Sequence, residues 1–179
     1  DAKQDAPRES FVHVHVPLIR GSAEKAALAE NLRSLLDEVR QVTDDWKPMR
    51  ARLRSAIIDF RHDHPPLPAA VVEETTAFLQ WLEEDNFVFF GVREYSYGQG
   101  DAAALEPPSE GGLGILRDPN VTVLRRGQDL VTMTPELRAF LTSPDPLIVT
   151  KANVKSRVHR RDYMDYVGVK RFEDGKVSG

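Results

Sequence analysis

The spacing of hydrophobic residues along this chain changes near residue 86, and the change limits the folds open to it. From about residue 22 to that point, apolar side chains recur every three or four residues, which is the period of amphipathic helices. After it, short apolar runs are separated by turn residues, which is typical of an antiparallel sheet. The chain's 179 residues suffice for one ordinary domain or two small ones. We predict an α+β fold with a helical segment followed by a mainly antiparallel β-sheet.

Three helices are predicted in the first half. The first begins after Ser22, a plausible N-cap, and carries an apolar stripe of Leu28, Leu32, Leu35, Leu36, Val39 and Val42. The second has Pro48 in its first turn, where a missing N–H costs nothing, with Asp44 or Asp45 helping to cap it. The third covers about 69–85.

A strand is predicted ahead of these helices. Residues 11–16 alternate, with three valines on one face and Phe11, His13 and His15 on the other. Two imidazoles on one face could bind a metal ion or lie at a half-buried interface. The sequence specifies no third ligand, so whether His13 and His15 bind a metal stays open.

The second half is predicted to be mostly strands. Residues 87–92 have the composition of a buried strand, and 98–112 that of a loop rich in Gly, Pro and Ala. Residues 158–172 are predicted as a long strand or a broken pair, followed by a hairpin turn at Asp174-Gly175. Thr134-Pro135 predicts a helix start. Short strands are expected at 113–116, 121–124 and 147–150.

Motifs for self-sufficient chemistry are missing from the sequence. It contains no cysteine, which excludes disulfides and thiolate chemistry. Its glycine cluster at 111–114 precedes a predicted strand and lacks the dinucleotide fingerprint, so it is interpreted as a loop hinge. No serine lies in a nucleophile elbow. We therefore assign no catalytic, cofactor-binding or metal residue.

The net charge and the hydropathy of the chain argue against DNA and a lipid bilayer as its binding partners. The formal net charge of −4 argues against a dedicated DNA-binding protein. No apolar run has the roughly 18 residues that a membrane span needs. The polar first ten residues lack the apolar core of a signal peptide.

The most unusual stretch is 151–161, which holds several basic residues and no acidic one. If Arg157, His159 and Arg161 share a strand face, they form a basic row that could bind a carboxylate, a phosphate or a nucleic-acid backbone. A solvated edge strand, protected by charge from aggregation, explains the stretch as well. The candidate effector or interface residues are Lys151, Asn153, Arg157, His159 and Arg161.

The run from Lys151 to Phe172 (KANVKSRVHRRDYMDYVGVKRF) closely resembles the N-terminal region of the large bacterial NAD-specific glutamate dehydrogenases. Shorter pieces agree in order, among them Phe78-Leu79-Gln80-Trp81-Leu82 and Asn86 to Tyr95 (NFVFFGVREY). The resemblance covers nearly the whole chain.

The resemblance implies a very long cytoplasmic, homo-oligomeric enzyme that oxidises L-glutamate with NAD. Its catalytic lysines and NAD-binding domain lie far downstream, so this fragment is expected to bind no cofactor and to perform no catalysis. ACT-like (ferredoxin-like) elements are expected. Residues 1–85 would hold the end strand of a preceding ACT-like unit plus a helical connector. Residues 86–179 would form an incomplete ACT-like or related sheet.

These expectations together predict a regulatory or assembly segment that contacts the rest of its polypeptide and senses an amino acid. One alternative is a purely structural oligomerisation module. Another is an anion- or nucleic-acid-binding module that uses 151–161. Salt dependence distinguishes them, because a nucleic-acid complex weakens steeply as salt rises and an apolar interface does not.

Overall fold

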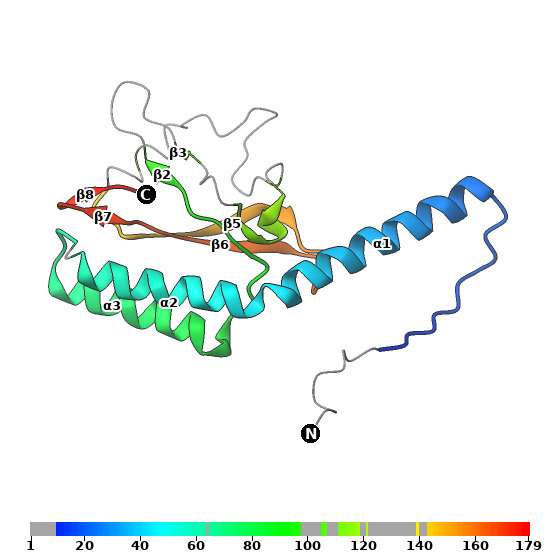
Figure 1. Ribbon diagram of the computed structural model, residues 1–179, viewed down its shortest axis with the longest axis horizontal. Helices are drawn as coiled ribbons and strands as arrows, with labels where there is room; N and C mark the ends of the chain where they lie inside the picture. The colour runs from blue at the N-terminus through cyan, green and yellow to red at the C-terminus, as the bar shows by residue number, and fades with distance from the viewer. Residues whose placement is uncertain are drawn as a thin grey trace, which may run out of the picture. The chain divides into compact units, whose positions relative to one another are not determined.

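The computed structural model describes residues 10–63, 65–97, 105–106, 111–118, 121, 139 and 143–179 (Figure 1). The chain forms two compact units, 1–33 and 34–179, and the boundary falls inside the first helix. Helices and small antiparallel sheets occur together, which confirms the predicted α+β class.

The described helices follow the predicted pattern. They are α1 (Ser22–Asp44), α2 (Trp46–His62) and α3 (Ala69–Trp81). Pro48 is the third residue of α2, where its missing N–H breaks no intrahelical bond.

The end of α3 is a wide π-type turn, η1 (Leu82–Asn86), in which Asp85 has a left-handed φ of 63°. The side-chain amide of Asn86 donates to the carbonyl oxygens of Trp81 and Glu84 at 2.9 and 3.3 Å. These bonds satisfy helix-end carbonyls that would otherwise lack donors. The chain thereby turns from helix into the second half.

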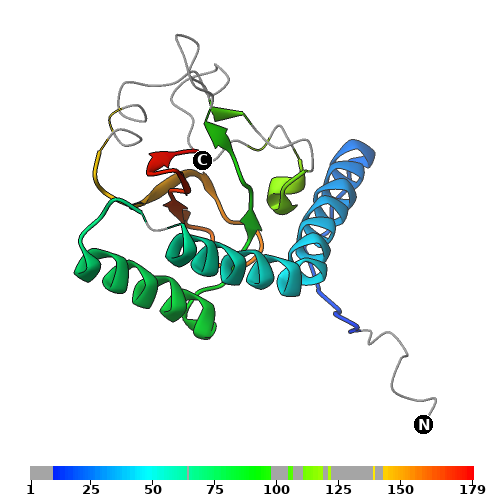
Figure 2. The ribbon, with the colours of Figure 1, turned by 60° about the vertical axis from the view of Figure 1, so that its left-hand side comes forward.

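Two longer strands form the main ladder. Strand β5 (Leu147–Lys155) pairs antiparallel with β6 (Tyr163–Val169), with Leu147 opposite Val169 and Lys151 opposite Asp165. Helices α2 and α3 lie side by side along one face of this ribbon (Figures 1 and 2). The core between these layers is built on Ile57, Leu79 and Leu82, with Leu53, Phe78, Phe87, Phe89, Leu147, Val167 and Val169 packed against them.

Three shorter antiparallel pairs complete the described strands. Strand β1 (Gly91–Val92) pairs with β4 (Leu113–Gly114), and β2 (Ser96–Tyr97) pairs with β3 (Leu105–Glu106). Strand β7 (Phe172–Glu173) pairs with β8 (Lys176–Val177). A 3-10 turn, η2 (Ile115–Arg117), follows β4.

The predicted hairpin turn at Asp174-Gly175 is confirmed. Both residues have positive φ, 48° and 73°, as the two-residue turn that matches strand twist requires. The sequence therefore located this turn correctly from the Asp-Gly dipeptide.

Three strand predictions differ from the structure. Residues 11–16 pair with no segment among those described, and Phe11 is 95% exposed. Alternating apolar residues give a segment one apolar face, but a strand also needs a neighbouring strand with which to form hydrogen bonds. Residues 158–162 form bends, so the predicted long strand begins only at Tyr163. Of 87–92, only Gly91 and Val92 pair.

Other predicted elements are shorter or fall outside the described residues. Ile115 and Leu116 belong to η2, so the strand predicted at 113–116 ends at Gly114. Residues 122–124 and most of the helix predicted after Thr134 lie outside the described ranges.

Candidate functional site

The predicted basic row lies in a loop. Residues 156–162, here called the basic loop, connect β5 to β6 and are closed by Ser156 N–H donating to Asp162 O at 2.9 Å. The Ser156 hydroxyl oxygen also accepts from the N–H groups of Val158 and His159, both at 3.3 Å. A serine side chain that satisfies nearby N–H groups favours a turn over a ladder. Arg157, His159 and Arg161 therefore do not share a strand face.

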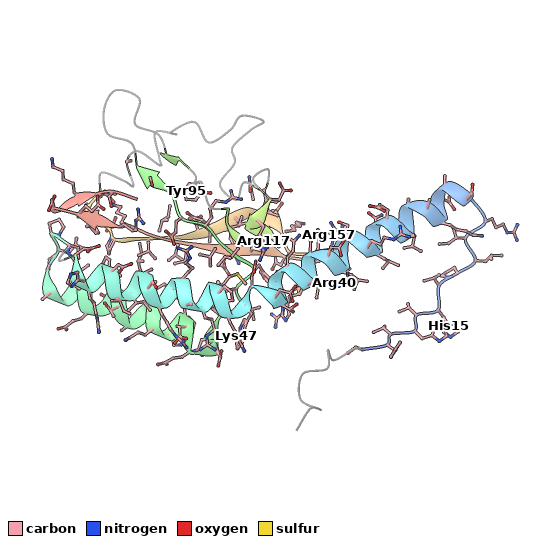
Figure 3. The ribbon with its side chains drawn as sticks, viewed as in Figure 1. His15, Arg40, Lys47, Tyr95, Arg117 and Arg157 are labelled. Atoms are coloured by element: carbon pink, nitrogen blue, oxygen red, sulfur yellow. The ribbon has the colours of Figure 1, made fainter. Side chains whose placement is uncertain are left out.

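Two of the predicted site residues are held by carboxylates. The Arg157 guanidinium donates to Glu38 Oε1 at 2.7 Å and to Ser34 Oγ at 3.4 Å, which ties the basic loop to α1 (Figure 3). Lys151 Nζ lies 2.7 Å from Asp165 Oδ1 on the paired strand. That hydrogen bond raises the pKa of Lys151 above its ordinary value.

The remaining basic residues of this stretch are exposed. Within the described part of the chain, His159, Arg160 and Arg161 form no ion pair. Lys155 Nζ lies 4.9 Å from the centre of the Tyr163 ring, within cation–π range. Asn153 is exposed on β5, where the strand register shifts. The structure thus leaves a cationic tip on the basic loop.

A cavity of about 640 Å³ lies between α2, residues 87–95 and residues 162–171, and we call it the slot. Lys151 and His159 line it, as does Arg160, whereas Asn153, Arg157 and Arg161 are absent from its described lining.

A chain of ion pairs lies among the residues that line the slot. Glu94 contacts Arg52 of α2 at 2.7 Å and Arg171 at 3.5 Å. Tyr166 lines the slot from β6, and burial raises the pKa of its hydroxyl to about 12. The walls of the slot therefore combine charged and aromatic side chains.

Asp45 and Arg93 have positioning roles that the sequence analysis missed. Asp45, expected as a helix cap, makes no capping bond and instead accepts from Gly114 N–H at 2.7 Å and from the Arg117 guanidinium, which lies beside the junction of α1 and α2 (Figure 3). Arg93 donates to carbonyl oxygens of Asp118 and Val121 at 2.8 and 3.1 Å. These partners are 25 to 72 residues apart, so no local signal could have revealed them.

The histidine pair does not form a metal centre with other described side chains. The rings of His13 and His15 lie 4.6 Å apart between centroids. No group of three potential metal ligands occurs among the residues that the structure describes. In the same part of the chain, no helix combines the length and the apolar character needed to cross a membrane.

Comparison with known proteins gives a consistent result. The chain matches no protein-family model. It is 31% identical over 180 residues to the NAD-specific glutamate dehydrogenase of Halomonas elongata, covering 98% of this chain and 11% of that protein. It is 30% identical over 176 residues to the NAD-specific glutamate dehydrogenase of Pseudomonas aeruginosa, covering 97% of this chain and 10% of that protein.

The chain therefore spans about a tenth of the length of these relatives. The sequence resemblance is confirmed: nearly the whole chain is similar to one segment of the NAD-specific glutamate dehydrogenases.

Proposed function

We propose that this chain is a non-catalytic, N-terminal segment of an NAD-dependent glutamate dehydrogenase and serves its regulation or assembly. The full enzyme would convert L-glutamate and NAD to 2-oxoglutarate and ammonia in the cytoplasm, with NAD bound by other parts of the polypeptide. The similarity to two such enzymes over 97–98% of the chain supports the proposal.

The cationic tip of the basic loop is the observation that carries a regulatory role. His159, Arg160 and Arg161 are exposed and form no ion pair with the described residues, in a chain whose net charge is −4. A guanidinium matches a carboxylate with two parallel hydrogen bonds. The proposed effector is therefore a small amino acid or oxoacid whose carboxylate meets Arg160 or Arg161.

The two paired cations hold the loop in place for that contact. Arg157 joins it to Glu38 of α1, and Lys151 joins β5 to Asp165 of β6. Because each already has a carboxylate partner, an effector would have to displace that partner to bind there. We therefore place the contact on Arg160 and Arg161, with Lys151, Asn153, Arg157 and His159 as its surroundings.

A thermal-shift titration with amino acids and 2-oxoglutarate tests this role. A ligand that binds only the folded chain raises the melting temperature in a saturable manner by mass action. The shift should be lost in Arg160→Ala or Arg161→Ala and kept in Arg61→Ala, which removes an exposed arginine from α2. No shift with any compound, or an equal loss in Arg61→Ala, would reject an effector site on the basic loop.

A purely structural role is the second candidate, favoured by exposed apolar side chains. Ile58, Val88 and Val149 are 65, 59 and 60% exposed. Burying such side chains between subunits would stabilise an oligomer. Sedimentation at low and high salt tests this role, because apolar association persists at high salt while association through the basic loop weakens.

A further inference from the structure

The lining of the slot shows that it lies between two strand edges. Every residue from Phe87 to Tyr95 lines it on one side, and every residue from Asp162 to Arg171 on the other. Side chains of a strand alternate between its two faces, so a cavity over a face would touch every second residue. A cavity lined by consecutive residues instead faces the main-chain edge.

The hydrogen bonds of β6 and β7 identify which main-chain groups face the slot. In an antiparallel ladder, successive residues direct their N–H and C=O groups to opposite neighbours. Lys170 N–H donates to Pro146 O at 3.0 Å, on the β5 side, whereas Arg171 bonds to Ser178 and Gly179 on the other side. By this alternation Val169, Val167 and Asp165 direct their main-chain groups away from β5.

The opposite wall shows the same alternation. Ile115 N–H donates to Phe90 O at 2.9 Å, and Val92 lies opposite Leu113, so the bonds of these residues run toward β4. Phe89 and Gly91 therefore direct their main-chain groups to the other edge. The main chain of Phe89 forms no hydrogen bond among the described residues.

Strand β8 already points into this space. Ser178 N–H donates to Arg171 O at 2.9 Å, and Arg171 N–H donates to Gly179 O at 2.7 Å. A Cβ atom added at Gly179 would lie 2.4 Å from Tyr95 O, so Gly179 is held between the two edges. A continuation of β8 in the same direction would run beside Lys170 and then Val169, antiparallel to β6.

We propose that the slot is the site of an extended polypeptide strand that continues β8 past Gly179 and joins β1 to β6 in one sheet. The relatives of this chain are about nine to ten times longer, so such proteins contain polypeptide that could supply the strand. About six residues span the roughly 20 Å from Arg171 to Asp165 at 3.3 Å per residue. The wall on the α2 side is mixed, with Leu53, Ala56 and Phe60 beside Arg52, Ser55, Asp59 and Asp63. The strand's side chains should therefore be apolar where they meet Leu53, Ala56 and Phe60.

Amide hydrogen exchange on a lengthened chain tests the strand. Eight residues of alternating valine and threonine are added after Gly179. One version starts with valine and the other with threonine, because a shift by one residue moves every side chain of a strand to the opposite face of the sheet. A third version carries prolines in place of every second added residue, which removes ladder donors. Exchange of individual amides is followed by NMR.

The expected result depends on the alternation along β6. Exchange of the Val167 and Val169 amides should slow by about tenfold or more in one alternating version. The amides of Tyr166 and Gly168 should change little, because they already donate toward β5. The proline version should leave all four amides unchanged.

Three results would overturn the proposal. The first is that neither alternating version slows exchange of the Val167 and Val169 amides. The second is that the proline version slows them equally. The third is that a small amino acid slows these amides in the unextended chain while the extensions do not, which would make the slot a small-molecule site.

Discussion

Replacing Asp45 tests whether the long-range contact at the α1–α2 junction stabilises the fold. Asp45 is 2% exposed, and its carboxylate accepts from Gly114 N–H and from the Arg117 guanidinium. In Asp45→Ala the Gly114 N–H loses its acceptor, which costs about 1–3 kcal/mol. The Arg117 side chain is 53% exposed and regains water in the variant, so the loss of its ion pair with Asp45 adds only about 1 kcal/mol to the destabilisation. The expected loss of unfolding free energy is about 2–4 kcal/mol.

Urea denaturation measures this loss, with an unchanged slope showing that the unfolded state is unaffected. Asp44→Ala is the matched control, because Asp44 is exposed and its replacement should stay within about 0.5 kcal/mol. Equal losses for Asp45→Ala and Asp44→Ala would refute the reasoning.

The same contact predicts a pH dependence. The hydrogen bond from Arg117 lowers the pKa of Asp45 below its ordinary value of 3.8 in the folded chain. A lowered folded pKa means that the contribution to stability is complete above 3.8 and is lost as pH falls through the folded pKa. The stability difference between the native chain and Asp45→Asn should therefore shrink in strong acid. A difference that grows there would contradict this account.

Three further predictions follow from local geometry. Gly114→Ala should lower the unfolding free energy, measured by urea denaturation, more than Gly175→Ala does. Both glycines have positive φ, which alone costs an alanine about 1–2 kcal/mol, but an added Cβ at Gly114 would also lie 2.1 Å from a carbonyl oxygen, whereas Gly175 has open space around it. Spectrophotometric titration should show a tyrosine ionising near pH 12 that disappears in Tyr166→Phe, and because the folded pKa is raised, native stability should fall between pH 10 and 12. Glu83→Gln should lower the melting temperature more than Glu84→Gln, because Glu83 accepts from two arginines.

The helices were predictable because their information is local. The apolar stripe from Leu28 to Val42 and the tolerance for Pro48 in a first turn each depend on neighbours within one or two turns. Ser22, predicted as the N-cap, is instead the first residue of α1, and the Gly21 carbonyl accepts from the Lys25 N–H at 3.1 Å. The Asp174-Gly175 hairpin was predictable for the same reason, because two adjacent residues favour positive φ.

The strands were less predictable because a strand needs a partner. The alternation of residues 11–16 gives a strand-like face, but no described segment pairs with it. In the same way, the apolar run at 87–90 lies along one wall of the slot, and its far edge has no ladder partner among the described residues. Sequence composition signals the ability to pair and does not supply the partner.

At the candidate site, the sequence and the tertiary structure supplied different information. By itself, the sequence determined that basic residues concentrate at 151–161 and that the chain resembles a segment of a glutamate dehydrogenase. Only the tertiary structure decided that Arg157 and Lys151 are paired with carboxylates while Arg160 and Arg161 remain exposed. The physical reason is that an ion pair depends on distance in space, and Glu38 reaches Arg157 across 119 residues of sequence.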